Sequence, residues 1–518
     1  VPLYYRRGYQ VSDGYAGDPL YHRTLYHLKA GKHLRVGGHI EKDAGERWVD
    51  SWGVHAELRQ LGVLRKAVAG DFRMGFAEGL VAGGVSWFSR TTPAARTQTG
   101  IRARTGTDET RFLRGAAATL ALGKELELTL FASARRADAT LQADGSVRTL
   151  LTTGLHRTSS ERMRKNSVGT QLYGGNLTWR HKGWHLGTTG YYQQFGRPLN
   201  PGEQAYRKYY PRGRQFGAMG IHYGKSVYRL AVAGETALST EQGLTGVQDS
   251  GTRRGGSRGV APLHRLTWRP GPRYTWSAVQ RYYAPSYTSM QASALSRGSR
   301  VQNENGLLLH LRAEPWDTWQ ILSYADFFYH PWPPYGCQTS RTGQEFQFQL
   351  AHPLGESTCL TGRYILRHTT DDTQNSRHRM RLQLTTQPSS HWRLQSTASL
   401  LHTQYGTGFS LLHGVRYEHA APSLMLSAVA GYARPGKSRS GMSEYLPTLS
   451  GAMGQVFLYG ETVHGTLLGR WRSRAERWRI EARYSVRRVL DASTQGSGLQ
   501  TIYSPWRHDL AFQVRLRI

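Results

Sequence analysis

Arginine is concentrated on one face of the last third of the chain. Eleven arginines there lie on the polar side of strand-like segments, so neighbouring strands would gather them into one basic wall. A guanidinium group donates two parallel hydrogen bonds to a phosphate, which suits such a wall to a polyanion. The same groups could instead pair with carboxylates of neighbouring strands or with a plug. The arginines are Arg379, Arg381, Arg393, Arg470, Arg472, Arg477, Arg479, Arg483, Arg487, Arg515 and Arg517.

A second candidate site is a segment that interleaves aromatic residues and cations. Aromatic rings stack on bases and cations bind phosphates, so this composition suits single-stranded nucleic acid. A loop in the lipopolysaccharide headgroup layer would have the same composition, and both interpretations stay open. The residues are Tyr206, Arg207, Lys208, Tyr209, Tyr210, Arg212 and Arg214.

A third candidate is the acidic run Glu41-Lys42-Asp43-Ala44-Gly45-Glu46. Paired carboxylates can perform acid–base chemistry or bind Ca²⁺, but this run lacks the spacing of a calcium loop. It follows a strand-like segment. We therefore expect these carboxylates to form ion pairs with arginines of the basic wall.

The remaining residues that could do chemistry form no recognised motif. The 21 histidines include no HExxH, and neither GxSxG nor GxxxxGK[ST] occurs. Cys337 and Cys359 flank a strand-like segment (342–352), which predicts no disulfide between them. The sequence predicts no enzyme, no cofactor and no metal.

The elements that position these residues are strands with a period of two. Leu510, Phe512, Val514, Leu516 and Ile518 alternate with polar or small residues, and segments 227–232, 377–384 and 477–487 repeat the pattern. Each has one apolar and one polar face. No sustained helical pattern competes with them.

Connections between these segments alternate between short and long. Short turns are expected at 182–183, 224–225, 270–271, 314–315, 353–356, 388–390, 420–422 and 473–475, and long loops at 86–108, 139–167, 196–212, 236–256, 284–303, 330–341, 369–376, 435–460 and 489–504. This is typical of transmembrane barrels, with short periplasmic turns and long extracellular loops. The fold class is therefore all-β, an antiparallel transmembrane barrel of about 24 strands (range 22–26). The apolar face would meet lipid and the arginine-rich face the lumen.

Composition supports this fold class and narrows the partners. The chain has 518 residues, an apolar content of 38% and no stretch near 18 consecutive apolar residues, which excludes a transmembrane helix. Aromatic residues make up 11%, which argues against disorder. The net charge of +32 favours phosphate-bearing partners such as nucleic acid, lipopolysaccharide or another anionic polymer.

Seven segments in order resemble the barrel region of Bacteroidota outer-membrane proteins of the helix-hairpin-helix or ComEA-like family. The resemblance covers nearly all 518 residues and implies that Glu41, Lys42, Asp43, Glu46, Asp71, Arg114, His156, Arg157, Asn303 and Glu304 are family motif residues. Members of that family carry an export signal and a helix-hairpin-helix segment ahead of the barrel, to which their DNA-uptake role is tied, and residues 1–518 contain neither. Glu78 stands where the family often has Gln, and Ile518 where many barrels end on an aromatic residue. The segments are 17–19, 38–46, 70–80, 114–117, 154–161, 281–283 and 303–306.

These observations predict a single outer-membrane barrel domain over residues 1–518. Its expected function is a conduit or binding platform for nucleic acid or another polyanion, with the bilayer and lipopolysaccharide as surroundings. The alternative is a scaffolding subunit of a larger outer-membrane secretion or assembly complex, with other outer-membrane proteins as partners. A nutrient transporter is a third, weaker interpretation, because no plug domain of about 100 residues opens the chain. Loops 86–108 and 139–167 would close the conduit if they folded inward.

Overall fold

The computed structural model describes residues 5–83, 90–91, 98–106, 108–241, 258–370, 375–419, 423–436 and 441–518. Strands dominate this part of the chain, and its one α-helix is the short α1 (Ser159–Met163). Across these ranges, no helix is long and apolar enough to cross a membrane.

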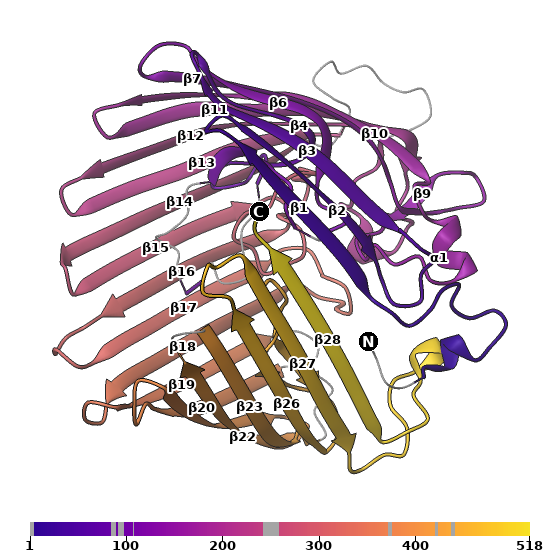
Figure 1. Ribbon diagram of the computed structural model, residues 1–518. Coiled ribbons are helices and arrows are strands. Elements are labelled where there is room, and N and C mark those ends of the chain that lie inside the picture. Colours follow the sequence, from indigo (N-terminus) through magenta and orange to yellow (C-terminus); the bar gives the residue numbers. More distant parts are fainter. Residues whose placement is uncertain are drawn as a thin grey trace.

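The wall of the molecule is a long antiparallel meander (Figure 1). Its first strands are β1 (His22–Ala30), β2 (Leu34–Lys42), β3 (Ser51–Leu61), β4 (Leu64–Ala77), β6 (Leu113–Ala121), β7 (Leu126–Ala137), β10 (Val168–His181), β11 (Trp184–Leu199), β12 (Gly213–Val227), β13 (Leu230–Thr240), β14 (Arg258–Gly271) and β15 (Tyr274–Tyr283). The others are β16 (Glu304–Ala313), β17 (Gln320–His330), β18 (Arg341–Pro353), β19 (Thr358–Thr370), β20 (Asn375–Thr386), β21 (Trp392–Thr403), β22 (Gly406–His419), β23 (Ser423–Arg434), β26 (Thr462–Arg472), β27 (Trp478–Val489) and β28 (Trp506–Leu516).

These 23 strands belong to one sheet of 26 described strands. Of the other members, β5 (Gln98–Ala103) pairs with residues 72–77 of β4, whereas β6 pairs with residues 64–72 of the same strand. The two strands therefore lie end to end along β4 and together occupy one position in the wall. The last two, β8 (Ala139–Leu141) and β9 (Val147–Leu150), form a hairpin in the loop after β7. The predicted fold class, an antiparallel barrel of about 24 strands, is confirmed.

The minor elements lie in the loops. A separate hairpin consists of β24 (Met442–Tyr445) and β25 (Gln455–Leu458). Three single-turn helices are η1 (Arg7–Tyr9), η3 (Ala205–Arg207) and η4 (Gly498–Gln500).

The turns confirm most of the expected boundaries and correct two. β10 and β11 are joined at 182–183, as predicted, and β16 ends at Ala313. The predicted turns at 224–225 and 270–271 are wrong, because the β12–β13 ladder runs on to Val227 and Leu230 and the β14–β15 ladder to Gly271 and Tyr274. The predicted turn at 420–422 and parts of the loops 86–108, 236–256, 369–376 and 435–460 lie outside the described residues.

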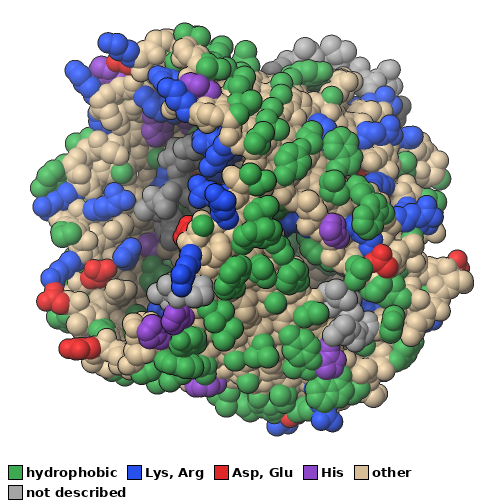
Figure 2. Space-filling model, in the orientation of Figure 1, with side chains coloured by type: hydrophobic (Ala, Val, Ile, Leu, Met, Phe, Trp, Pro, Cys, Tyr) green, Lys and Arg blue, Asp and Glu red, His purple; other side chains and the backbone are tan. Residues whose placement is uncertain are grey.

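Side chains alternate between the two faces of the wall as the sequence predicts. On β28, Leu510, Phe512, Val514 and Leu516 are exposed, while Ala511 and Gln513 between them are half-buried. Apolar side chains cover much of the outer surface in Figure 2. A closed or nearly closed sheet with this exterior is a transmembrane barrel of the outer-membrane type, because hydrocarbon excludes unpaired backbone groups.

Two loops fold into the lumen and form the largest apolar core. Residues 78–83 follow β4, and residues 284–303 connect β15 to β16. Leu80 and Val81 from the first segment and Tyr287 from the second are fully buried against the inner faces of β10 to β17. By contrast, residues 139–167 carry β8, β9 and α1 and pack at the loop ends of β11 and β12, where Val147 pairs with Leu199.

The facing of β28 gives a first prediction. We expect Phe512→Arg, which places a charge in the lipid near the middle of the strand, to cost about 2–4 kcal/mol and to reduce the membrane-assembled yield sharply. Gln513→Arg, on the lumen face beside Glu481, should assemble normally. Heat-modifiable migration of the membrane fraction on gels measures both yields. Equal losses for the two variants would show that the faces of β28 are not as described.

Candidate functional site

Five strands near the C-terminus hold the basic wall. The alternation of faces directs the predicted arginines of β20, β21, β26, β27 and β28 toward the lumen, because the apolar residues between them face outward. Arg477 and Arg517 lie just beyond strand ends, where the backbone amide of Arg517 donates to the carbonyl of Arg477 at 2.8 Å. The structure therefore brings the predicted set together on one side of the barrel.

Part of this wall is covered by the loop that carries β24 and β25. Arg381 donates to the buried Glu444 of β24 at 2.8 Å, and Ser410 donates to the same carboxylate at 2.5 Å. On the other side of the loop, the backbone amide of Ser450 donates to Glu481 of β27 at 2.7 Å. Arg470 lies 3.4 Å from Glu481 and donates to the Thr448 carbonyl at 2.6 Å. This loop lies inside the barrel because carboxylates tie it to the wall.

Two more arginines of the wall contact the same loop. Arg483 donates to the Thr448 hydroxyl at 3.0 Å, and Arg487 donates to the Phe457 carbonyl at 3.4 Å. Arg472 instead pairs with Glu476 of the adjacent turn at 2.9 Å. The expectation that lumen arginines pair with carboxylates or a plug is thus met for part of the set.

Six of the predicted arginines have no ion-pair or side-chain hydrogen-bond partner within the described ranges. Cavities between the wall and the loop of β24 and β25 bring some of them to solvent. One, of about 500 Å³, includes Arg416, Arg470 and Arg479 in its lining, and a neighbouring one of about 310 Å³ includes Arg393. Figure 2 shows a hollow with lysine and arginine side chains along its rim. The six are Arg379, Arg393, Arg477, Arg479, Arg515 and Arg517.

The other side of the lumen is closed by the inward segment 78–83. Glu235 of β13 is fully buried and accepts three backbone hydrogen bonds from that segment. The donors are the amides of Glu78 at 2.9 Å, Leu80 at 3.0 Å and Val81 at 3.1 Å. The Glu78 side chain pairs with Arg265 of β14 at 2.7 Å. No motif in the sequence singles out Glu235, although a lone carboxylate on the lumen face of a strand is a signal that could mark it.

The inward loop 284–303 is held by a buried ionic network. Arg281 on β15 contacts Glu304 at 2.6 Å and Asp326 at 2.9 Å. Arg297 of the loop contacts Asp326 at 2.5 Å and Glu345 of β18 at 2.7 Å. The family motif residue Glu304 therefore has a structural partner, whereas Arg297, Asp326 and Glu345 carried no signal in the sequence. Breaking one partner of such a network leaves a buried charge unpaired, which is strongly destabilising.

The acidic run 41–46 does not pair with the arginines of the basic wall, and that expectation is wrong. Glu41 accepts a hydrogen bond from the Tyr21 hydroxyl at 2.6 Å, and Lys42 pairs with Asp18 at 3.0 Å. Glu46 accepts from the backbone amides of His156 at 2.6 Å and Asp43 at 2.9 Å. The run lies at the loop end of β2, so the residues within reach are those of 18–21 and 156.

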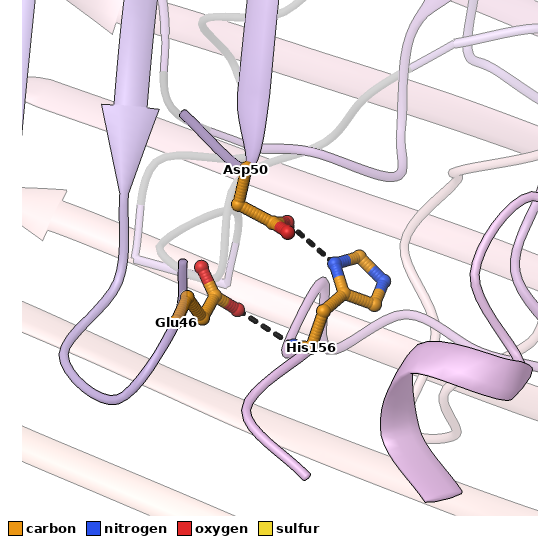
Figure 3. Close-up of side chains that lie close together, drawn as sticks. All are labelled: Glu46, Asp50 and His156. Atoms are coloured by element: carbon orange, nitrogen blue, oxygen red, sulfur yellow. Dashed lines mark hydrogen bonds and ion pairs between the residues drawn. The ribbon is translucent and has the colours of Figure 1, made fainter. Parts of the chain in front are cut away.

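His156 lies at the centre of a charged cluster between the connection that precedes β3 and the connection that follows β7 (Figure 3). Its Nδ1 lies 2.5 Å from Asp50 and its Nε2 2.8 Å from Asp138, while Lys165 pairs with Asp50 at 2.7 Å. Burial lowers the pKa of His156, but the hydrogen bonds that the ring donates to both aspartates, with their negative charges, outweigh it and raise the pKa to about 9. The imidazolium and Lys165 in turn hold the pKa of Asp50 below its usual range, against the effect of burial.

This cluster also contains the metal-like group Glu46, Asp50 and His156, whose ligand atoms lie within 4.8 Å of one another. Both ring nitrogens of His156 already contact carboxylates, so neither has a lone pair directed at an ion. The arrangement fits a clamp of opposite charges that joins the loop before β3 to residues 138 and 151–166. The chemistry of the donor set does not favour a metal centre.

The remaining family motif residues also have structural partners. Asp71 of β4 contacts Arg114 at 2.6 Å and Arg104 at 3.2 Å. Arg157 pairs with Glu161, which forms the capping box of α1 with Thr158. Asn303 accepts a hydrogen bond from the Trp332 amide at 2.8 Å. These motif residues stabilise the loop ends of the barrel.

The aromatic and cationic side chains of loop 206–214 mostly contact other residues of the chain. Lys208 lies 4.5 Å from the Trp332 ring, and the Tyr209 ring meets the same indole edge to face at 5.1 Å. Arg207 donates to the Pro201 carbonyl at 2.5 Å, and Arg212 donates to the Gly202 carbonyl at 2.6 Å. Arg300 stacks on Tyr210 at 4.0 Å. These contacts join neighbouring loops and leave fewer aromatic faces for a base than the sequence suggests.

The known proteins that the chain resembles are solved structures of β-barrels. No family model and no curated protein matches the chain. The P pilus usher PapC translocation pore has a TM-score of 0.43 and 8% identity, with 96% of this chain and 95% of that chain covered. A mutant of the ferric enterobactin receptor PfeA of Pseudomonas aeruginosa has a TM-score of 0.45 and 9% identity, with 95% of this chain and 79% of that chain covered. A BenF-like porin of Pseudomonas fluorescens Pf-5 has a TM-score of 0.31 and 10% identity, with 75% of this chain and 98% of that chain covered. The barrel assignment rests on the strand pairing itself, and by that pairing and its apolar exterior the chain is an outer-membrane β-barrel.

The three hydrogen bonds to Glu235 predict a releasable plug. We expect Glu235→Ala to leave three backbone amides without an acceptor, two of them buried at about 1–3 kcal/mol each, and to free residues 78–83 from the wall. Conductance in planar bilayers should rise severalfold over the unaltered protein. Glu127→Ala, at the turn end of β7, is the control and should leave conductance unchanged. No rise for the Glu235 variant, with normal assembly, would contradict this role of the segment.

The raised pKa of His156 predicts a pH-dependent loop clamp. Because the folded pKa of about 9 exceeds the ordinary 6.5, the stabilisation is complete below pH 6.5 and is lost as the pH rises through 9. His156→Gln should lose about 2 kcal/mol of local stability at pH 6.5. Trypsin cleavage near Arg162 should then be roughly 30-fold faster than in the unaltered protein at pH 6.5, and nearly equal at pH 10.

The control for this test is His181→Gln at the turn end of β10, which should cleave like the unaltered protein at both pH values. A rate ratio for His156→Gln that stays constant between pH 6.5 and 10 would exclude the protonated clamp.

Proposed function

We propose that this outer-membrane barrel binds an elongated, phosphate-bearing polyanion along its basic wall and serves as its conduit or binding platform. Nucleic acid is the first polyanion to test, since arginine forks recognise phosphate and the resemblance to helix-hairpin-helix-associated barrels points to DNA. The observation that carries the proposal is the set of six lumen-side arginines that lack partners among the described residues. Such a set favours an anionic ligand.

The division of the lumen supports this proposal. The inward segments 78–83 and 284–303 fill the side lined by β10 to β17, whereas the arginines line the side formed by β20 to β28. A polyanion entering from the turn end would first meet Arg479, which lines the cavity of about 500 Å³. Arg393, the second residue of β21, lies equally near the turn end, and farther along the polyanion would meet the loop of β24 and β25, which we expect to move aside.

The second candidate is a scaffolding subunit of a larger outer-membrane complex. The observation that favours it is the wall of described strands, in which no ladder joins β1 directly to β28. Pull-down in mild detergent separates the two functions. Stoichiometric partner barrels would support the scaffold, and a protein that purifies alone and binds polyanion would support the conduit.

Salt dependence of binding tests the basic wall. We expect the quadruple variant Arg379→Gln, Arg393→Gln, Arg479→Gln and Arg515→Gln to bind single-stranded DNA at least tenfold more weakly at 0.1 M salt. Each arginine that no longer neutralises a phosphate should lower the slope of log K against log salt by about 0.7, or roughly 3 for all four. Fluorescence anisotropy of a labelled oligonucleotide with the detergent-solubilised protein measures both.

The control is Arg273→Gln, in the exposed turn after β14, where the guanidinium pairs with Asp317. This variant should keep the original slope. An unchanged slope for the quadruple variant would exclude the basic wall as the binding surface, and equal losses for both variants would indicate binding by net charge alone.

A further inference from the structure

Arginines of β19 and β20 face each other on the inside of the barrel. Arg363 is paired with Arg381, and Arg367 with Arg377. Paired residues of an antiparallel ladder project from the same face about 5 Å apart, and like charges in these positions repel each other. This face is the lumen face, because Arg381 contacts the inward loop of β24 and β25. With the residue between two of them on β20, these arginines form the β19–β20 cluster, which consists of Arg363, Arg367, Arg377, Arg379 and Arg381.

The β19–β20 cluster is poorly neutralised by the described part of the chain. Arg381 has a carboxylate partner, Glu444, at 2.8 Å. Arg377 donates only to a backbone oxygen, the Gly441 carbonyl, at 3.4 Å. The other three arginines make no hydrogen bond or ion pair with any residue in the described ranges. These three are Arg363, Arg367 and Arg379.

The neighbouring strand β18 brings one carboxylate close to the cluster, but that carboxylate is already bound. Glu345 is paired with Arg367 in the β18–β19 ladder. Its side chain contacts Arg297 of the inward loop at 2.7 Å and accepts a hydrogen bond from the Tyr324 hydroxyl at 2.7 Å. Glu345 therefore holds the inward loop, and the positive charge of the cluster stays largely uncompensated.

Buried hydrogen-bond donors without an acceptor lie at the same place. Gln347 of β18 is paired with Ile365, which lies between two arginines of the cluster on the same face of β19. The Gln347 side chain is only 4% exposed, and its amide nitrogen has no acceptor among the described residues. The buried Nε of Arg377 also lacks an acceptor there. A buried donor of this kind is costly unless a ligand supplies the acceptor.

The dimensions of the cluster define the ligand that fits. Residues 377 and 381 are four positions apart on one strand, so the cluster is about 13 Å long and two strands wide. Arg367 and Arg379 are exposed, which makes the cluster accessible from the lumen. A phosphomonoester carries about 1.5 to 2 negative charges at pH 7 and three acceptor oxygens, whereas each phosphodiester of a nucleic acid carries one charge. Converging donors in so small an area therefore favour the more highly charged group.

We propose that the β19–β20 cluster and Gln347 bind a compact phosphate group with more than one negative charge, namely a phosphomonoester or a pyrophosphate. The guanidinium groups of Arg363, Arg367 and Arg379 and the Gln347 amide donate to its oxygens, and its charge offsets the repulsion between the paired arginines. This is a small-ligand site that shares only Arg379 and Arg381 with the basic wall. It does not depend on whether that wall binds nucleic acid.

Titration calorimetry of the detergent-solubilised full chain with inorganic pyrophosphate tests this proposal. The double variant Arg363→Gln and Arg367→Gln should bind pyrophosphate at least about tenfold more weakly than the unaltered protein. Without ligand, the same variant should keep its heat-modifiable form to a higher temperature, because both like-charge pairs are removed. Damage to the fold would lower that temperature instead. An unchanged affinity, or a lower unfolding temperature, would overturn the proposal.

The matched control is the double variant Arg479→Gln and Arg515→Gln, which removes another pair of arginines that face each other across a ladder. This variant should bind pyrophosphate like the unaltered protein and should weaken only the binding of single-stranded DNA. Equal losses of pyrophosphate affinity in both double variants would overturn the proposal, because the anion would then respond to net charge. Gln347→Leu leaves every charge in place and should weaken pyrophosphate binding severalfold, so an unchanged affinity there would also count against the site.

Competition with oligonucleotides identifies the source of the phosphate group. One oligonucleotide carries a 5′-phosphate and the other, of the same sequence, a 5′-hydroxyl. Stronger displacement of pyrophosphate by the 5′-phosphorylated strand would support a phosphomonoester at the end of a larger ligand, and displacement by neither strand would support a free small anion. Complete displacement by the 5′-hydroxyl strand would overturn the proposal, because phosphodiesters would then occupy the β19–β20 cluster.

Discussion

Hydrocarbon offers no hydrogen-bond partner to a backbone amide or carbonyl, and the architecture of this chain depends on that constraint. It requires the long antiparallel meander, because only neighbouring strands can satisfy each crossing segment. It also fixes the alternation of side chains, since each strand must present one face to lipid and the other to the lumen.

A wall of this circumference encloses more space than its own side chains fill. The chain fills part of this space with its own loops, which are held in place by ion pairs and by hydrogen bonds to charged side chains. Glu235 holds the segment after β4 through backbone amides, and the network of Arg281, Arg297 and Asp326 holds the loop before β16. In both cases a charged group that would be costly to bury alone is made acceptable by several partners.

The same logic explains why the two sides of the lumen differ. Carboxylates of the β13 to β18 region are neutralised by arginines or backbone donors, and the loops there pack tightly. On the side of β20 to β28, arginines outnumber carboxylates, so Glu444 and Glu481 can anchor one loop while other guanidinium groups remain without a protein partner. A phosphate-bearing ligand on one side and a structural plug on the other follow from this uneven distribution of charge.

The sequence by itself determined the fold class, the number of strands to within its stated range, the lipid-facing residues of β28 and the gathering of arginines on one face. These properties are local, because the period of a strand decides which way each side chain points. The tertiary structure alone decided which loops fold inward, where the β12 and β14 ladders end and what the acidic run contacts. Glu235 meets amides 154 to 157 residues away and His156 meets an aspartate 106 residues away. No local pattern encodes such pairs, because they depend on how the closing wall brings distant loop ends together.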